Sequence, residues 1–178
     1  NPQLLDYKKE GCQVYNSAKM TLEEVLEEIF RAEEENKMTV RLHTGDPCLY
    51  GAIREQMDVL DERGIEYDYC PGVSSFCGAA SALNLEYTLP DVSQSVIITR
   101  MAGRTPVPEK EEIASFAAHH ATMVIFLSTG MLEKLSERLI EGGYTADTPA
   151  AVVYKATWED EKAFVCTVGT LAETARKN

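Results

Sequence analysis

The stretch that decides the fold is Arg41-Leu42-His43-Thr44-Gly45-Asp46-Pro47-Cys48-Leu49-Tyr50-Gly51. An apolar and β-branched run leads into it, and a helix-compatible run, residues 52–63, leaves it. The order of strand, tight loop and helix is typical of the place where open α/β sheets bind ligands. Gly45 permits a backbone conformation closed to other residues, and Pro47 pushes Asp46 towards an extended conformation. Asp46 is therefore expected at the carboxyl end of a strand, facing a ligand.

A second interpretation of Asp46 is purely local. An Asp followed by Pro is also a typical start of a helix, with Asp46 as the N-cap and Pro47 at the first helical position. The two roles can coexist, so the spacing alone leaves both open.

The first half of the chain alternates between strand and helix patterns. Thr21-Leu22-Glu23-Glu24 has the pattern of a capping box and starts a helix with an apolar stripe. The predicted strands are residues 12–15, 39–43 and 65–70, and the other predicted helices are residues 52–63 and 76–83. This alternation implies a parallel sheet. Residues 84–94 have no clear period and are predicted to connect two domains.

The alternation resumes in the second half. The predicted strands are residues 95–99, 123–127, 150–154 and 163–167, and the predicted helices are residues 109–119, 131–141 and one that begins at 171. The last two strands are joined by a connection short enough for a hairpin. We therefore predict an α/β fold of two α/β domains, residues 1–88 and 89–178, with a cleft between them. The first domain should hold a mostly parallel sheet and the second a mixed sheet.

Composition excludes several classes of function. The 178 residues carry a net charge of −12, which argues against a nucleic-acid binder held by general electrostatics. No apolar run reaches the length of a membrane span, and no signal peptide is recognised. The five cysteines are odd in number and lack C-x-x-C spacing, which predicts reduced thiols in a cytoplasmic protein and no metal site.

The chemistry available at the predicted strand ends favours binding over acid–base work. The chain has no nucleophile elbow, no Walker loop and no G-x-G-x-x-G motif. What remains is a set of loops, residues 44–49, 71–75, 100–106, 127–130 and 156–157, which offer backbone groups, hydroxyls, one carboxylate and two arginines. That inventory suits the holding of two ligands together. No residue is a compelling general base, so the catalytic residues are left unassigned.

Four of these segments resemble one known family. Residues 41–51, Tyr69-Cys70-Pro71-Gly72-Val73-Ser74-Ser75, residues 98–109 and Phe126-Leu127-Ser128-Thr129-Gly130 are similar to motifs of the tetrapyrrole (corrin and porphyrin) methylases. The resemblance covers essentially the whole chain. The segment 98–109 is the narrower signature, and it resembles members that methylate ring carbon 11 of a corrin precursor in cobalamin biosynthesis.

The resemblance implies a cytoplasmic homodimer in which S-adenosylmethionine (SAM) lies in a trough between two α/β domains. It places eight residues along SAM: Thr44, Gly45, Asp46, Leu49, Ser74, Ser75, Leu127 and Ala156. It places three more, Arg100, Met101 and Arg104, on the loop that faces a tetrapyrrole substrate. The alternative for each arginine is an ordinary surface or interdomain ion pair. Neither nucleic acid nor membrane is an expected partner.

One departure from the family pattern bears on activity. Family members begin with a strand and a glycine-rich loop that also touches SAM, and the sequence, which opens at Asn1, shows no such segment. The closing strand of the second domain is also not recognised, so the chain is expected to be a fragment of something longer. The expected activity is SAM-dependent C-methylation. The alternatives are another methyltransferase of the same fold, acting on uroporphyrinogen or on a modified histidine, and a non-catalytic α/β module.

Overall fold

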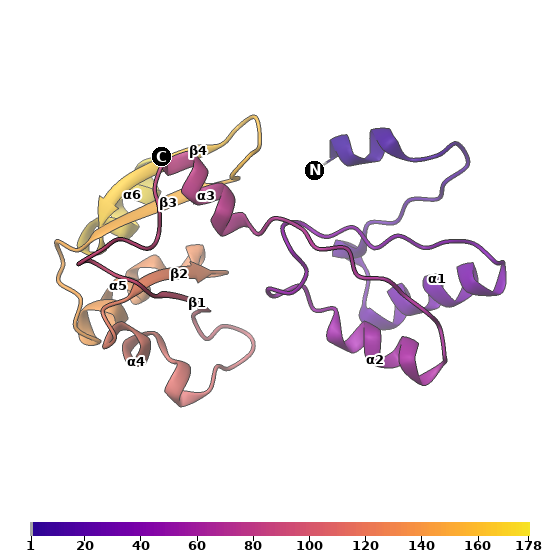
Figure 1. Cartoon of the computed structure of the whole chain (residues 1–178), viewed down its shortest axis with the longest axis horizontal. Coiled ribbons are helices and arrows are strands. Elements are labelled where there is room, and N and C mark those ends of the chain that lie inside the picture. Colours follow the sequence, from indigo (N-terminus) through magenta and orange to yellow (C-terminus); the bar gives the residue numbers. More distant parts are fainter. Residues whose placement is uncertain (1) are drawn as a thin grey trace. The chain divides into compact units, whose positions relative to one another are not determined.

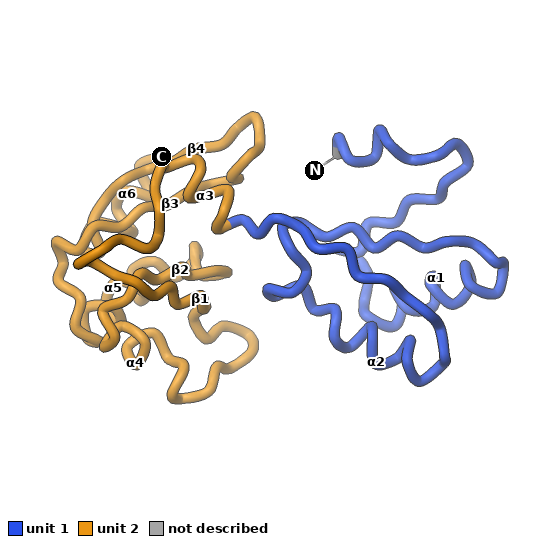
Figure 2. The backbone as a smooth tube through the Cα atoms, viewed as in Figure 1, with its two compact units in different colours: residues 1–75 blue, residues 76–178 orange. Residues whose placement is uncertain are grey.

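The computed structural model describes residues 2–178. The chain divides into two compact units, unit 1 ending at Ser75 and unit 2 spanning Phe76–Asn178 (Figure 2). The division comes earlier than the predicted boundary after residue 88, so residues 76–88 belong to unit 2. The division into domains 1–88 and 89–178 stays a prediction.

Unit 1 is built around two α-helices (Figure 1). Its elements are η1 (Pro2–Tyr7), η2 (Ser17–Lys19), α1 (Leu22–Glu34) and α2 (Arg54–Glu62). Helix α1 starts as predicted, because Thr21 accepts a hydrogen bond from the Glu24 N–H while the Glu24 side chain accepts one from the Thr21 N–H. The apolar stripes of the two helices form one small core, made of Val25, Leu26, Ile29 and Leu60.

The predicted parallel sheet of unit 1 is wrong for the described residues. Residues 12–15, 39–43 and 65–70 run without assigned strand structure, and no ladder of backbone hydrogen bonds joins them. Apolar and β-branched residues favour a strand, but a strand also needs a neighbour to take its backbone groups. Without one, Met38 and Val40 are 91% and 69% exposed.

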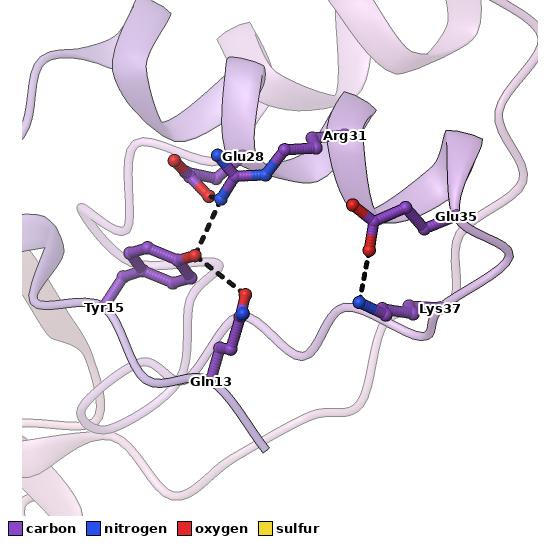
Figure 3. Close-up of polar contacts among 6 residues, drawn as sticks. All are labelled: Gln13, Tyr15, Glu28, Arg31, Glu35 and Lys37. Atoms are coloured by element: carbon purple, nitrogen blue, oxygen red, sulfur yellow. Dashed lines mark hydrogen bonds and ion pairs between the residues drawn. The ribbon is translucent and has the colours of Figure 1, made fainter. Parts of the chain in front are cut away.

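Side-chain contacts, and not backbone pairing, attach residues 12–15 to helix α1. The Tyr15 hydroxyl accepts a hydrogen bond from Arg31 Nη2 of α1 at 2.7 Å and donates one to Gln13 Oε1 at 2.9 Å (Figure 3). Arg31 also forms an ion pair with Glu28 one turn earlier in α1. The guanidinium of Arg31 therefore links α1 to the segment that precedes it.

Unit 2 combines helices with two pairs of strands and is α/β in class (Figure 1). Its elements are α3 (Ser75–Leu83), which starts at the last residue of unit 1, β1 (Val96–Arg100), η3 (Glu109–Glu111), α4 (Ile113–Ala117), β2 (Thr122–Phe126), η4 (Thr129–Met131), α5 (Leu132–Glu141), β3 (Pro149–Tyr154), β4 (Lys162–Thr167), η5 (Val168–Thr170) and α6 (Leu171–Lys177). Most were predicted to within two residues. The predicted helix 109–119 is instead split into η3 and α4.

The strands of unit 2 form two separate two-stranded sheets, where one mixed sheet was predicted. β1 pairs with β2 in parallel, with Val96 opposite Thr122 and Arg100 opposite Phe126. β3 and β4 form the predicted antiparallel hairpin, with Pro149 opposite Thr167. Because β1 and β2 are parallel, their carboxyl ends lie side by side, and the loops that follow them start from the same edge.

The core of unit 2 lies where α4, α5 and α6 meet the sheets. It contains Met101, Ile113, Ala117, Leu135, Leu139, Val168 and Leu171. This core is larger than that of unit 1, and it fixes the helices that flank β1 and β2. Met101, the first residue after β1, belongs to this core, which therefore holds the carboxyl end of β1 in place.

Residues 84–94 were predicted to connect two domains, but they pack within unit 2. Leu89 and Ser93 form an isolated bridge, and the Tyr87 hydroxyl donates to the Phe76 carbonyl at 2.6 Å. Thr122, at the start of β2, donates its hydroxyl to the Tyr87 carbonyl at 2.8 Å. The segment thus holds α3 against the β1–β2 sheet, and it begins no new unit.

Candidate functional site

In unit 1 the structure brings together the two loops predicted to bind one ligand. We call residues 44–49 the first loop and residues 71–75 the second loop. A Cβ added at Gly72 would lie 2.1 Å from the Gly45 carbonyl oxygen, so only glycine allows this approach of the two backbones. Gly45 has a φ of +67°, which other residues adopt at a cost, and its Cα faces the backbone of Ser74 and Ser75.

Asp46 joins the two loops. Its Oδ1 accepts hydrogen bonds from the Cys48 N–H at 2.8 Å and from the Tyr69 hydroxyl, and its Oδ2 accepts one from the Gly72 N–H at 2.9 Å. Helix α2 begins only at Arg54, with Ile53 as its N-cap. The N-cap interpretation of Asp46 is therefore wrong, because the side chain binds the second loop and lies well before the helix.

The electrostatics of this contact keep Asp46 ionised. The hydrogen bond from Tyr69, followed by those from the Cys48 and Gly72 N–H groups, lowers the pKa of Asp46 far below its ordinary value. The same hydrogen bond raises the pKa of Tyr69 to about 12, and Asp46 raises the pKa of the Cys48 thiol. At neutral pH the site therefore contains a carboxylate and a neutral phenol.

The other predicted residues of unit 1 surround this contact. Thr44 and Ser75 are exposed, Leu49 is half-buried and Ser74 is 8% exposed. After the first loop, Tyr50 and Ala52 have φ values of +58° and +49°. Strained backbone of this kind is enriched at ligand sites. No sequence pattern predicts these conformations, because neither residue type favours a positive φ.

In unit 2 a buried hydroxyl plays the part that Asp46 plays in unit 1. Ser128, which is 2% exposed, follows β2 and accepts a hydrogen bond from the Met101 N–H at 3.0 Å. It donates its own proton to the Phe126 carbonyl at 2.7 Å. Ser128 therefore joins the carboxyl ends of β1 and β2.

The two predicted cofactor residues of unit 2 lie in strained turns. Leu127, between β2 and Ser128, has a φ of +53° and is 69% exposed. Ala156 follows β3, between Lys155 and Thr157, whose φ values are +48° and +71°. A Cβ on Gly78 of α3 would lie 3.2 Å from the Ala156 Cβ, so helix and turn are in close contact. An exposed leucine on strained backbone offers an apolar surface to a ligand.

The three predicted substrate residues differ in their surroundings. Arg100 Nη1 donates to the Met101 and Thr105 carbonyls, both at 3.1 Å, and Nη2 donates to Thr105 Oγ1 at 2.9 Å and to the Pro106 carbonyl at 3.0 Å. Met101 is 5% exposed and belongs to the core of unit 2. Arg104 is exposed at the tip of the loop, and among residues 2–178 no hydrogen bond or ion pair holds it.

Within residues 2–178, no group of three or more His, Cys, Asp and Glu side chains is placed to hold a metal ion. No helix of that range is long and apolar enough to cross a membrane. All five cysteines are free thiols.

Sequence reasoning missed Tyr69 and Ser128, each of which joins two segments within its own unit. Both lay inside segments singled out for their motifs, but neither was given a role. Their signal is weak because each acts across a distance in sequence: Tyr69 binds Asp46, and Ser128 binds Met101, both more than twenty residues away.

The chain is similar to one family of known proteins, both in sequence and in structure. The family model described as Tetrapyrrole (Corrin/Porphyrin) Methylases matches residues 3–172. A cobalt-precorrin-4 C(11)-methyltransferase from Methanocaldococcus jannaschii is 51% identical over 177 residues, which cover 99% of this chain and 68% of the relative. A precorrin-4 C(11)-methyltransferase from Pseudomonas aeruginosa is 41% identical, over 99% of this chain and 71% of the relative. The crystal structure of a cobalt precorrin-4 methyltransferase superposes with a TM-score of 0.96 at 44% identity, covering 100% of this chain and 74% of the other.

Proposed function

The chain belongs to the tetrapyrrole (corrin/porphyrin) methylase family, and we propose that it transfers a methyl group from SAM to ring carbon 11 of precorrin-4 or cobalt-precorrin-4 in cobalamin biosynthesis. The observation that carries this proposal is the 51% identity to a cobalt-precorrin-4 C(11)-methyltransferase over 99% of the chain. Relatives named for the substrate with and without cobalt both align, so the proposal includes both forms.

The family, the α/β class and the use of SAM as co-substrate confirm what the four sequence segments predicted. The individual contacts remain proposals. We assign SAM to the first and second loops of unit 1 and to the turns that carry Leu127 and Ala156 in unit 2. The geometry supports this assignment: Gly45 and Gly72 let the backbones of the two predicted SAM-binding loops meet, and Leu127 presents an exposed apolar side chain.

The reaction asks for alignment more than for acid–base catalysis. A nucleophilic ring carbon attacks the methyl carbon of SAM. A carbon–carbon bond forms, the bond from methyl to sulfur breaks, and its electron pair stays on sulfur in S-adenosylhomocysteine (SAH). The protein holds both molecules in line and excludes water. Such alignment can lower the activation barrier by about 7–11 kcal/mol.

For the substrate we assign different tasks to the two arginines. The guanidinium of Arg100 is committed to four bonds within its own loop, so it shapes that loop. Arg104 has no such partner among the described residues and suits a substrate carboxylate, which a guanidinium binds bidentately. Met101 is buried, so we assign its side chain to the core and not to the substrate.

The direct test is to incubate the protein with SAM and precorrin-4 or cobalt-precorrin-4, and to measure SAH release and the mass of the macrocycle. We expect one added methyl group, and none when uroporphyrinogen III is offered instead. Methylation of uroporphyrinogen III alone would move the protein to the rival substrate class. Failure to bind SAM would favour a non-catalytic module.

Substitutions at the arginines test the substrate assignment. Arg104→Ala should raise the KM for the tetrapyrrole about 10- to 100-fold and leave the KM for SAM nearly unchanged, because a charged hydrogen bond is lost. Arg104→Lys keeps the charge but loses the planar fork, so it should recover only part of the affinity. Arg54→Ala, an exposed arginine on α2, is the matched control. An Arg104→Ala enzyme with a normal tetrapyrrole KM would contradict the assignment.

The remaining expectations concern the state of the protein in the cell. We propose a homodimer in the cytoplasm, and the absence of nucleic-acid and membrane partners stays a prediction. The five free thiols support a reducing compartment. Sedimentation of the purified protein would test the dimer.

A further inference from the structure

Tyr69 lies immediately before the second loop and reaches back to the first. Its hydroxyl donates to Asp46, whose carboxylate also accepts the N–H of Cys48 in the first loop and the N–H of Gly72 in the second. Three donors from two segments therefore converge on one carboxylate. A carboxylate offers about four acceptor positions, so most of the capacity of Asp46 is used within the protein.

From this convergence we infer that Tyr69 is a positioning residue for methyl transfer: through the Asp46 carboxylate, its hydroxyl fixes the first and second loops in the arrangement that receives SAM. The inference rests on the proposed function, since it presumes that these loops hold SAM. It replaces the expected direct contact between the Asp46 carboxylate and SAM with an indirect one. We call Tyr69 and Asp46 together the tyrosine latch.

Two further observations support the latch. The loops approach so closely that a Cβ on Gly72 would lie 2.1 Å from the Gly45 carbonyl oxygen, so a small movement of either loop changes the other. The pKa of Asp46 lies far below its ordinary value, and that of Tyr69 is raised to about 12. The latch is therefore made of a carboxylate and a neutral phenol over the whole physiological pH range.

The test is a double-mutant cycle on SAH affinity, measured by calorimetry with the protein, Tyr69→Phe, Asp46→Asn and the double variant. Tyr69→Phe keeps the ring and should weaken binding about 3- to 10-fold, the scale of one lost hydrogen bond. Asp46→Asn should weaken it at least as much. The double variant should bind no worse than Asp46→Asn, because the hydroxyl acts only through the carboxylate.

Controls separate the latch from general damage. Tyr67→Phe and Asp68→Asn change neighbouring exposed residues outside the latch and should leave SAH affinity unchanged. Alkylation by iodoacetamide, resolved by peptide, gives a local readout. Asp46→Asn should speed alkylation of Cys48, because Asp46 raises the pKa of that thiol. Half-buried Cys166 in unit 2 should react at the wild-type rate unless the protein unfolds.

Each outcome decides the question. Losses that multiply in the double variant would show that Asp46 and Tyr69 act separately, and would overturn the latch in favour of direct contact between Asp46 and SAM. A Tyr69→Phe protein that binds SAH as tightly as wild type would overturn the latch while the proposed function stands. A wild-type protein that binds neither SAM nor SAH would overturn both.

Discussion

The two units join their predicted ligand loops in different ways. In unit 1, the loops are joined by an ionised carboxylate near the surface, Asp46, and the hydrophobic core of the unit has four buried side chains. In unit 2, the corresponding joint is a neutral hydroxyl, Ser128, which is 2% exposed and lies against a larger core. A charged joint suits a place that water reaches, whereas a buried joint must be neutral and fully bonded.

The difference predicts where each unit is vulnerable. The contact made by Ser128 in unit 2 does not depend on a charge, so pH and salt should affect it little. Its removal would leave buried backbone groups without a hydrogen-bond partner. The hydrogen bonds of Asp46 in unit 1 depend on pH, because their strength depends on the charge of its carboxylate. The loops of unit 1 are therefore expected to loosen at acid pH, whereas the contact made by Ser128 in unit 2 carries no charge to lose.

Ser128→Ala should produce the largest loss of stability. The substitution leaves the Met101 N–H without its acceptor in a buried position, which costs about 1–3 kcal/mol in the free energy of unfolding. Urea unfolding would measure the loss. Ser115→Ala is the control, since that exposed hydroxyl makes only one long bond, 3.4 Å to the Glu109 carbonyl. If both variants unfold at the same urea concentration, Ser128 is not the structural joint of unit 2.

The pH dependence of stability should separate the two joints. The pKa of Asp46 is lowered in the folded protein, so its contribution is present above the unfolded pKa, about 4. That contribution decreases as the pH falls below about 4 towards the folded value. Tyr69 has the opposite sign: its pKa is raised to about 12, so its contribution is present below about 10 and is lost as the pH rises towards 12.

The measurement is the difference in unfolding free energy between wild type and Asp46→Asn at a series of pH values. It should be constant from pH 5 to 8 and shrink below about pH 4. The corresponding difference for Ser128→Ala should not change over this range, because a serine hydroxyl does not titrate. A difference for Asp46→Asn that persists undiminished at pH 2 would mean that the carboxylate charge does not hold the loops.

The same contrast explains what could be predicted from sequence. Features set by neighbouring residues were predicted correctly: the capping box of Thr21 and Glu24, the β3–β4 hairpin and the left-handed backbone of Gly45. The sheet of unit 1 was not, because an apolar run shows a tendency to form a strand but not whether a neighbour exists to pair with it. Asp46 was singled out from its motif, yet its partner Tyr69 lies 23 residues away and leaves no local pattern.

Met101 shows the opposite error. The family resemblance placed it, with Arg100 and Arg104, on the loop that faces the substrate, whereas the structure buries its side chain in the core of unit 2. A motif marks a segment, but alternate residues of a segment leaving a strand point in different directions. Burial of each side chain had to come from the packing of α4, α5 and α6.

Leu127 allows the finest test of the comparison, with the smallest expected effect on stability. In unit 1 the left-handed position within the first loop is a glycine, Gly45, whereas the turn after β2 in unit 2 has a leucine, Leu127, with a φ of +53° and 69% of its surface exposed. A strained backbone that carries an exposed apolar side chain is explained if the side chain contacts a ligand.

Leu127→Ala removes the side chain and keeps the strain. Leu127→Gly removes both, and relief of strain is opposed by the greater entropy of glycine in the unfolded chain. Leu127→Gly should therefore be more stable than Leu127→Ala by at most about 1 kcal/mol. Both variants should lose affinity for SAH to the same extent, about 3- to 10-fold, because both lose the same apolar contact. Calorimetry and urea unfolding on the two variants measure these quantities separately. Wild-type SAH affinity in both variants would remove Leu127 from the proposed site and leave its strained backbone as a consequence of how Ser128 joins β1 to β2.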